Sequence, residues 1–219
     1  MLSDGFVHFA EYELQIIALA WLCVLYAIKL FQLSRLPMLR ENAPRRGSAV
    51  VGTLRSYSSM FIPWSMESSR KHIYRWVEFG AYHVGAGVAI LNTFTSPFAP
   101  GMMTEPVRWI FAILIVPALL LGLVKLARRI TRPEMRLIST PDDYFSLASV
   151  EVFFFTAIMA LLVNNPLWRT IYFFITAGFL FYVPFSKISH YIYFFFAAIF
   201  TGSRYGWRGV RPPVGRQVE

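Results

Sequence analysis

Long runs of apolar residues constrain this chain more than any other feature of its sequence. Five stretches, 14–33, 74–94, 107–126, 145–163 and 167–200, are long enough to cross a bilayer, which takes about 20 mostly apolar residues in a helix. Backbone groups in lipid must satisfy one another, so the spanning segments are expected to be helices. The sequence therefore predicts an all-α integral membrane protein with five transmembrane helices, in one membrane domain over residues 1–219.

Composition agrees with a membrane location. Of the 219 residues, 56% are hydrophobic and 15% are charged, whereas an ordinary soluble domain has about 25% charged residues. The single cysteine, Cys23, allows no intrachain disulfide and no cysteine cluster for zinc or an iron–sulfur centre. Acidic residues rather than Lys or Arg precede the run 14–33, so we interpret it as a retained helix and not as a cleaved signal peptide.

The net charge of +9 gathers on one predicted side of the membrane. The segments 34–75 and 125–146 and the tail after residue 200 hold 17 of the 21 Lys and Arg residues, and loops on the other side hold only Arg108 and Arg169. Basic loops stay in the cytoplasm. We therefore expect a multi-pass protein of the cytoplasmic (inner) membrane, with its amino terminus outside and its carboxyl terminus in the cytoplasm. The charge then reflects topology and membrane lipids, and no nucleic-acid partner is expected.

The last apolar run, 167–200, is longer than a bilayer is thick, so we expect it to project beyond the membrane or to bend at Pro184. It contains the stretch PFSKISHYIYFFF, in which His190 interrupts apolar residues. An ionisable residue in a membrane segment is costly and marks a functional site by default. His190 is therefore a candidate site residue.

Three histidines, His72, His83 and His190, lie at or within the cytoplasmic half of the predicted spans. The spans 74–94 and 167–200 run in opposite directions, so they can pack antiparallel with two histidines facing each other. Helix bundles build cofactor sites in this way, and haem iron takes axial imidazoles. His83 or His72 could pair with His190. Basic residues flank His72 on both sides, which places it at the water interface and makes it the weaker candidate.

Three glycines, Gly80, Gly85 and Gly87, surround His83 in the stretch EFGAYHVGAGVA. Small residues in a membrane helix ordinarily let helices pack closely. The same absence of side chains would also leave room for a flat porphyrin. Both interpretations are open from the residues alone.

Three motifs together resemble the respiratory nitrate reductase gamma subunit, a family of five-span membrane cytochromes b. They are AYHVG around His83, LARRITRPEMRLISTPDDYFSL leading into the run 145–163, and FYVPFSKISHY around His190. The resemblance extends over about residues 70–200. PFSK followed three residues later by histidine is its most specific part, and the basic segment ending in TPDD comes next. The wider group includes membrane subunits of heterodisulfide-reductase-like, sulfite-reduction-associated and hydrogenase complexes.

The resemblance implies that His83 and His190 are the axial ligands of a haem b iron, with the haem between the second and fifth helices. The family's usual second haem takes histidines at positions that are Thr93 and Tyr172 here. One haem is therefore expected, and a quinone, a lipid or aromatic side chains should fill the outer space. The aromatic candidates are Phe94, Tyr172, Phe173 and Phe174.

The function expected from this resemblance is electron transfer by a membrane-anchor subunit that is not catalytic alone. It would link the quinone/quinol pool to an iron–sulfur protein subunit on the cytoplasmic side of a respiratory oxidoreductase complex. One alternative is a cofactor-free membrane anchor or assembly subunit. Another is a small transporter, because the intramembrane carboxylates Glu78 and Glu151 can mark an ion path.

Overall fold

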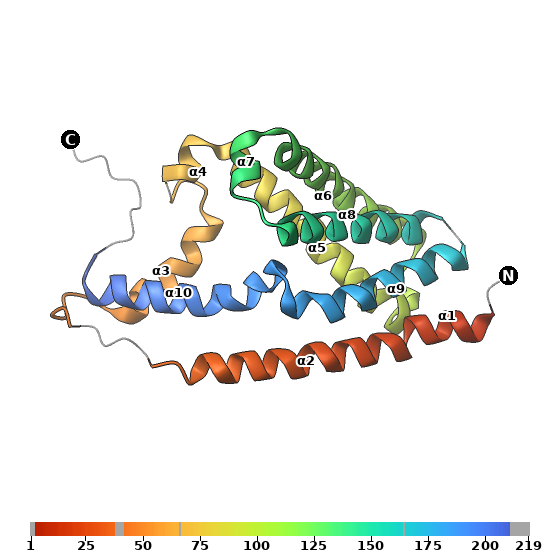
Figure 1. The fold of residues 1–219 in the computed structure, drawn as a ribbon, viewed down its shortest axis with the longest axis horizontal. Helices are drawn as coiled ribbons and strands as arrows, with labels where there is room; N and C mark the ends of the chain where they lie inside the picture. Colours follow the sequence, from red (N-terminus) through yellow and green to blue (C-terminus); the bar gives the residue numbers. More distant parts are fainter. Residues whose placement is uncertain (1–2, 38–41, 66, 164, 211–219) are drawn as a thin grey trace. The chain divides into compact units, whose positions relative to one another are not determined.

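The structure is a computed structural model that describes residues 3–37, 42–65, 67–163 and 165–210 (Figure 1). Within these residues every regular element is helical, which confirms the all-α prediction. The α-helices are α1 (Asp4–Glu11), α2 (Glu13–Ser34), α3 (Ala49–Phe61), α4 (Glu67–Lys71), α5 (Ile73–Phe98), α6 (Glu105–Thr131), α7 (Pro133–Leu137), α8 (Pro141–Leu162), α9 (Pro166–Tyr182) and α10 (His190–Trp207). Three 3₁₀ turns occupy Pro100–Met102, Val183–Phe185 and Lys187–Ser189.

Four helical segments in the described part of the chain are long and apolar enough to cross a membrane. They are Asp4–Ser34, Glu105–Thr131, Pro141–Leu162 and Pro166–Phe185. They correspond to four of the five predicted spans and indicate a membrane protein. The remaining span, 74–94, lies within the continuous helix α5, which polar residues such as His83 and Asn92 make less apolar than the other four. Its passage through the membrane stays a prediction.

The chain divides into two compact units. The first comprises Met1–Ser34 and Phe79–Ile188, and the second comprises Arg35–Glu78 and Ser189–Glu219. The division falls within α5 and just before α10, so each unit is described by itself. The single membrane domain over 1–219 stays a prediction. Three residues of the basic set that predicts the topology, Arg40, Arg211 and Arg216, lie outside the described residues.

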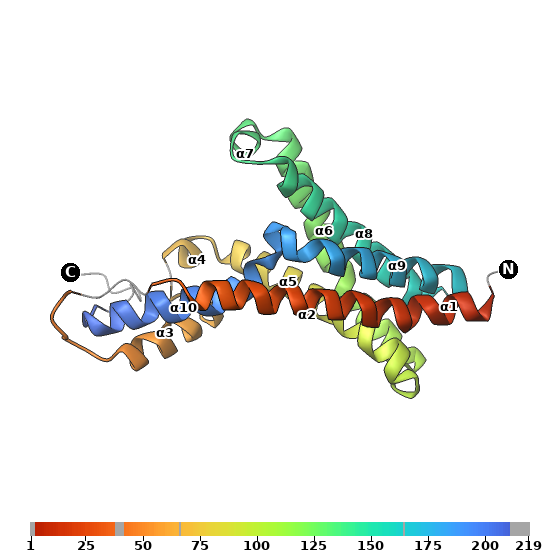
Figure 2. The same ribbon diagram turned by 60° about the horizontal axis from the view of Figure 1, so that its bottom comes forward.

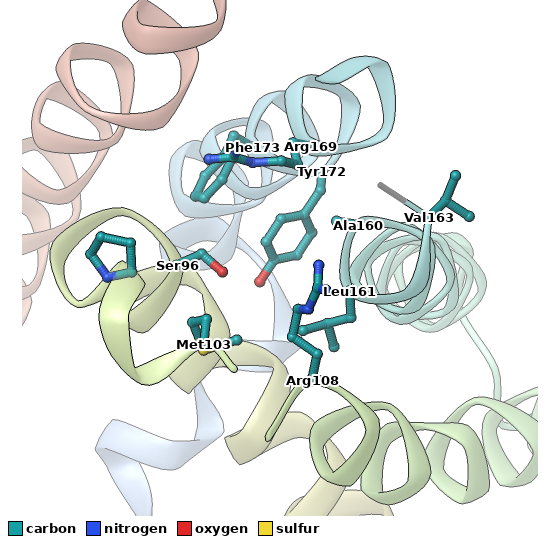
Figure 3. A pocket seen from close by; sticks show the side chains of 10 residues that line it. Ser96, Met103, Arg108, Ala160, Leu161, Val163, Arg169, Tyr172 and Phe173 are labelled. Atoms are coloured by element: carbon teal, nitrogen blue, oxygen red, sulfur yellow. The ribbon is translucent and has the colours of Figure 1, made fainter. Parts of the chain in front are cut away.

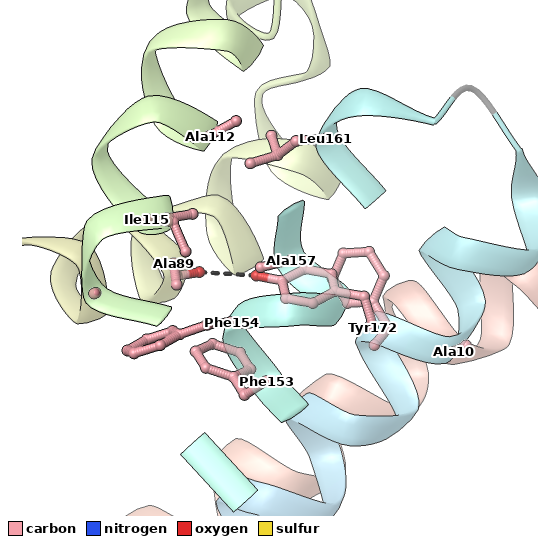
Figure 4. Packing of buried hydrophobic residues seen from close by; sticks show 11 residues of the cluster. Ala10, Ala89, Ala112, Ile115, Phe153, Phe154, Ala157, Leu161 and Tyr172 are labelled. Carbon is pink, nitrogen blue, oxygen red and sulfur yellow. Dashed lines mark hydrogen bonds between the residues drawn. The ribbon is translucent and has the colours of Figure 1, made fainter. Parts of the chain in front are cut away.

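In the first unit α2 lies along α9, and α6 lies along α8 (Figures 1 and 2). Its core lies where α5, α6, α8 and α9 meet, around Phe153, Phe154 and Tyr172 (Figure 4). Alanine residues contribute to the same core, where their small side chains let the helices approach closely. The Tyr172 hydroxyl donates a hydrogen bond of 2.8 Å to the Ala89 carbonyl oxygen (Figure 4). The buried phenol is therefore satisfied across two helices.

The helix α9 ends at Tyr182, and α10 begins at His190. Pro184 accounts for this end, because proline lacks a backbone N–H and its ring collides with the carbonyl group four residues earlier. The chain passes instead through the 3₁₀ turns Val183–Phe185 and Lys187–Ser189. The run 167–200 is thus divided near Pro184, where the sequence predicted a bend or a projection beyond the membrane.

Lys29 on α2 contacts the same break in the chain. Its ammonium group donates to the carbonyl oxygen of Pro184, and it lies 5.7 Å from the ring centroid of Phe185. Carbonyl groups at a helix end lack intrahelical partners, so a lysine beside them satisfies a group that would otherwise be unpaired in an apolar setting.

In the second unit α3 packs along α10 through glycine residues. A Cβ atom on Gly52 of α3 would lie 2.1 Å from the carbonyl oxygen of Gly202, and one on Gly206 would lie 2.8 Å from the Gly52 Cα. Gly202 and Gly206 have the four-residue spacing that lets membrane helices approach backbone to backbone. The Tyr57 hydroxyl donates to the Phe195 carbonyl oxygen at 2.8 Å and further joins the pair.

Candidate functional site

His83 lies on α5 in the first unit, with an exposed side chain. Its Nδ1 atom is 2.8 Å from the carbonyl oxygen of Phe79, one turn earlier. A carbonyl oxygen only accepts, so Nδ1 carries the hydrogen, and in the neutral ring the lone pair is on Nε2. Histidines that ligate a metal ordinarily donate their other ring N–H to such an acceptor. The tautomer of His83 therefore suits ligation through Nε2.

The glycines around His83 divide between two faces of α5. A Cβ atom on Gly85 would lie 2.3 Å from the Cβ of Ala118 on α6, so Gly85 allows close helix packing. A Cβ atom on Gly80 or Gly87 would meet no neighbouring heavy atom within 4 Å. Seven residues are close to two helical turns, so Gly80 and Gly87 share a face, and His83 lies beside it. Close helix packing is thus confirmed for Gly85, whereas a porphyrin beside the open face of Gly80 and Gly87 stays a prediction.

His190 is the first residue of α10, in the second unit, and its side chain is exposed. His83 and His190 therefore belong to different units, and their pairing stays a prediction. His72 also belongs to the second unit, where it is exposed just before α5 and meets the Tyr74 ring edge-on, with ring centroids 5.8 Å apart.

The described residues contain no group of three or more His, Cys, Asp or Glu side chains that could hold a metal ion. A haem iron takes only two axial imidazoles from the protein. A haem site therefore does not require three or more clustered ligands.

The two most specific motifs, TPDD and PFSK, meet in the first unit. Lys187 Nζ lies 2.6 Å from Asp143 Oδ2 and 2.9 Å from Thr140 Oγ1. The same Asp143 oxygen accepts from the Thr140 backbone N–H at 2.8 Å, as part of the capping box that begins α8. One aspartate therefore both caps α8 and binds the lysine that follows α9.

Asp142 takes part in the same contact. We use the name TPDD–PFSK contact for the interactions of Thr140, Asp142 and Asp143 with Tyr182 and Lys187. Its Oδ2 accepts from the Lys187 backbone N–H at 3.2 Å, and its Oδ1 accepts from the Tyr182 hydroxyl at 2.5 Å. The Tyr182 hydroxyl is also 2.9 Å from Ser146 Oγ. The start of α8 and the end of α9 are thus joined by side chains, which hold the residues that lead to α10. The sequence identifies both motifs but does not predict that they touch. The acidic pair Asp142 and Asp143 and the lysine Lys187 in an apolar run could have suggested an ion pair.

Glu151, one of the two carboxylates considered for an ion path, is buried on α8. Its Oε1 accepts from the Tyr82 hydroxyl at 3.2 Å, and the Lys125 ammonium group lies 3.9 Å from the Tyr82 ring centroid. A Cβ atom on Gly122 of α6 would lie 1.7 Å from Oε1, so this glycine makes room for the carboxyl group. These contacts join α5, α6 and α8 in a local polar cluster. Glu78, the other carboxylate, belongs to the second unit.

Thr93 and Tyr172 are the residues predicted to stand where a second haem would need histidines. The Thr93 hydroxyl donates to the Ile90 carbonyl oxygen within α5. The Tyr172 phenol donates to the Ala89 carbonyl oxygen. Both polar groups are therefore engaged with their own surroundings.

The aromatic residues expected to fill the outer space behave in two ways. Tyr172 and Phe173 are buried in the core of the first unit, whereas Phe94 is 42% exposed and Phe174 is 39% exposed. Two of the four therefore contribute to a filled interior, and the other two lie at its surface.

A pocket of about 180 Å³ lies beside Tyr172, among α5, α6, α8 and α9 (Figure 3). Its lining includes Arg108 and Arg169, the two basic loop residues expected on the outer side, together with Ser96 and apolar residues such as Leu161. Sequence reasoning used these arginines only for topology and missed the pocket. Nothing in the spacing of the two residues indicates that they share one.

No protein-family model, curated protein or solved structure matches this chain.

Proposed function

We propose that this chain is a haem-b electron-transfer subunit and membrane anchor, similar to the respiratory nitrate reductase gamma subunit, with His83 and His190 as the axial ligands. The state of His83 carries the proposal. Its Nδ1–H is donated to the Phe79 carbonyl oxygen, and it lies beside the open face formed by Gly80 and Gly87. A ligand histidine ordinarily has its other ring N–H bound in this way, and the open face of Gly80 and Gly87 leaves room for a flat macrocycle.

A haem b bound by these residues supplies one-electron transfer, because its iron alternates between two oxidation states. The hydrogen bond to the Phe79 carbonyl oxygen orients the His83 ring. It also makes Nε2 more basic and therefore a stronger ligand for iron. The TPDD–PFSK contact holds the segment that leads to His190, and Pro184 ends the helix before it.

The proposed complex has the chain crossing the inner membrane five times, with its amino terminus outside. An iron–sulfur protein subunit would bind on the cytoplasmic side, where the basic segments lie under this topology. The iron–sulfur centres belong to that partner, because this chain has a single cysteine. Electrons would pass between the partner and the quinone/quinol pool, with the quinone close to the single haem.

A reduced-minus-oxidised optical spectrum of the purified protein tests the proposal. We expect a b-type signal and, from pyridine haemochrome analysis, about one haem per chain, because two axial imidazoles hold one haem iron. His83→Ala and His190→Ala should each abolish the signal. His72→Ala and the control His8→Ala should leave it nearly unchanged.

The outcomes separate the alternatives. Loss of haem in His72→Ala with retention in His83→Ala would show that the ligand is assigned wrongly. A wild-type protein without a b-type signal would favour the cofactor-free anchor or the transporter. Two haems per isolated chain would contradict the prediction of a single haem.

A further inference from the structure

The pocket beside Tyr172 contains an arginine, Arg108, whose Nε atom finds no hydrogen-bond partner among the described residues. Arg108 lies near the start of α6, and its side chain points toward the space that Ser96 and Tyr172 also face (Figure 3). Its Nε atom is buried, and within the described residues it has no hydrogen-bond partner. The Ser96 hydroxyl donates to Asn92 Oδ1, and the Tyr172 hydroxyl donates to Ala89. Arg108 is therefore the donor that this pocket leaves for a ligand.

The other charges around the pocket compensate one another. Arg169 Nη2 lies 2.7 Å from Glu11 Oε1 and 2.9 Å from Oε2, and the Glu11 side chain is 6% exposed. The positive charge of Arg169 is thus matched by a buried carboxylate from α1. The charge of Arg108 remains, so the pocket carries one positive charge in excess.

A partly buried guanidinium without a partner is costly, because it has lost water without gaining an acceptor. Its planar fork matches the oxygen atoms of carboxylate and phosphate groups. A volume of about 180 Å³ holds an oxyanion together with a few water molecules, since one water takes about 30 Å³. Met103 and Leu161 add an apolar wall that suits the first part of a lipid's acyl chains.

We propose that this pocket binds one phosphate-type oxyanion, with Arg108 as its main hydrogen-bond donor. The oxyanion is the phosphate of an anionic phospholipid head group or a free phosphate ion, which share this chemistry. The inference does not depend on haem binding.

Native mass spectrometry of the full chain in detergent tests the lipid source, with phosphatidylglycerol as the probe and phosphatidylcholine as the zwitterionic comparison. Thermal shift with inorganic phosphate tests the free ion. Arg108→Gln should weaken binding of the preferred probe about tenfold or more, because hydrogen bonds to charged groups are among the strong ones. The matched control is Arg136→Gln on the exposed helix α7, which removes the same charge outside the pocket.

A second variant tests the sign of the charge. Glu11→Gln leaves the charge of Arg169 uncompensated, so we expect it to bind the probe at least about threefold more tightly. If Arg108→Gln does not fold, Arg108→Lys keeps the charge without the fork and should still bind several-fold more weakly than the wild type.

The source follows from the two probes. Selective binding of phosphatidylglycerol identifies a lipid site, whereas stabilisation by inorganic phosphate without lipid selectivity identifies a free-ion site. Equal binding by the wild type and the folded Arg108 variant would overturn the proposal. Failure of both probes to bind the wild type would overturn it as well.

Discussion

At the scale of single residues, the glycines of α5 show where the helix packs closely and where it does not. Gly85 and Gly87 are two residues apart on α5, yet only Gly85 faces another helix. A sequence-based rule that treats all glycines in a membrane helix alike would miss this difference. Substitution of each glycine by alanine adds one methyl group, so the effect on stability can be compared position by position.

We expect Gly85→Ala to lower the free energy of unfolding by about 1–3 kcal/mol, the usual cost of overpacking. The added Cβ would lie 2.3 Å from the Cβ of Ala118, and a backbone oxygen of α6 is 3.0 Å away. In the protein freed of haem, Gly87→Ala meets open space and should be neutral or stabilising by up to about 1 kcal/mol, because alanine favours the helix. Unfolding by SDS titration in mixed micelles measures both. Equal losses in the two variants would argue against the packing of α5 on α6.

At the scale of elements, contacts between segments that are distant in sequence hold the helix ends. The TPDD–PFSK contact joins the start of α8 to the end of α9. Asp143 has two main roles in it, the capping box with Thr140 and the ion pair with Lys187, and a longer ion pair of 3.8 Å joins its Oδ1 to Arg129 Nη1. The two roles can be separated because they use different partners.

We expect Asp143→Ala to cost about 1–2 kcal/mol more than Lys187→Met, since it removes a helix cap as well as an ion pair. The double-mutant cycle should give a coupling energy of about 1 kcal/mol, because Lys187 is 53% exposed and solvent weakens the pair. The exposed pair of Lys71 and Glu67 is the control, and Lys71→Met should cost less than about 0.5 kcal/mol. A coupling energy near zero would show that the TPDD–PFSK contact does not stabilise the protein.

The glycine contact between α3 and α10 gives a second prediction at this scale. Gly52→Ala should destabilise the second unit by about 1–3 kcal/mol, because its Cβ would lie 2.1 Å from the backbone oxygen of Gly202. Gly178→Ala on α9 is the matched control, since its Cβ would meet nothing within 4 Å. Limited proteolysis of the segment 35–78 reports on this unit separately from global unfolding. Unchanged cleavage in Gly52→Ala would contradict the close packing.

At the scale of the whole molecule, the question is how the chain crosses the membrane. Four segments are apolar enough by composition, and α5 is the helix on which the count of five depends. The two counts place the carboxyl terminus on opposite sides for a given position of the amino terminus, so topology tests the count directly.

We expect a fluorescent reporter fused after Glu219 to be active in the cytoplasm, and a periplasmic phosphatase at the same place to be inactive. Basic loops resist translocation, and 17 of the 21 Lys and Arg residues lie on the predicted inner side. A second fusion ahead of Asp4 should give the opposite result. Reporters that place both termini on one side would mean that α5 does not cross the membrane.

The sequence by itself determined that the chain is helical and membrane-bound, that its last apolar run is interrupted near Pro184, and which histidines are candidate ligands. These properties depend on the composition of each segment and on the covalent structure of proline. They require no contact with other parts of the chain. Only the tertiary structure decided that Gly85 rather than Gly87 faces α6, that Asp143 binds Lys187, and that the buried Nε of Arg108 has no hydrogen-bond partner in the described part of the chain. Each of these depends on which helices are neighbours and in what register. Many pairings of apolar helices bury similar areas, so the apolar pattern of the chain does not specify which of them forms.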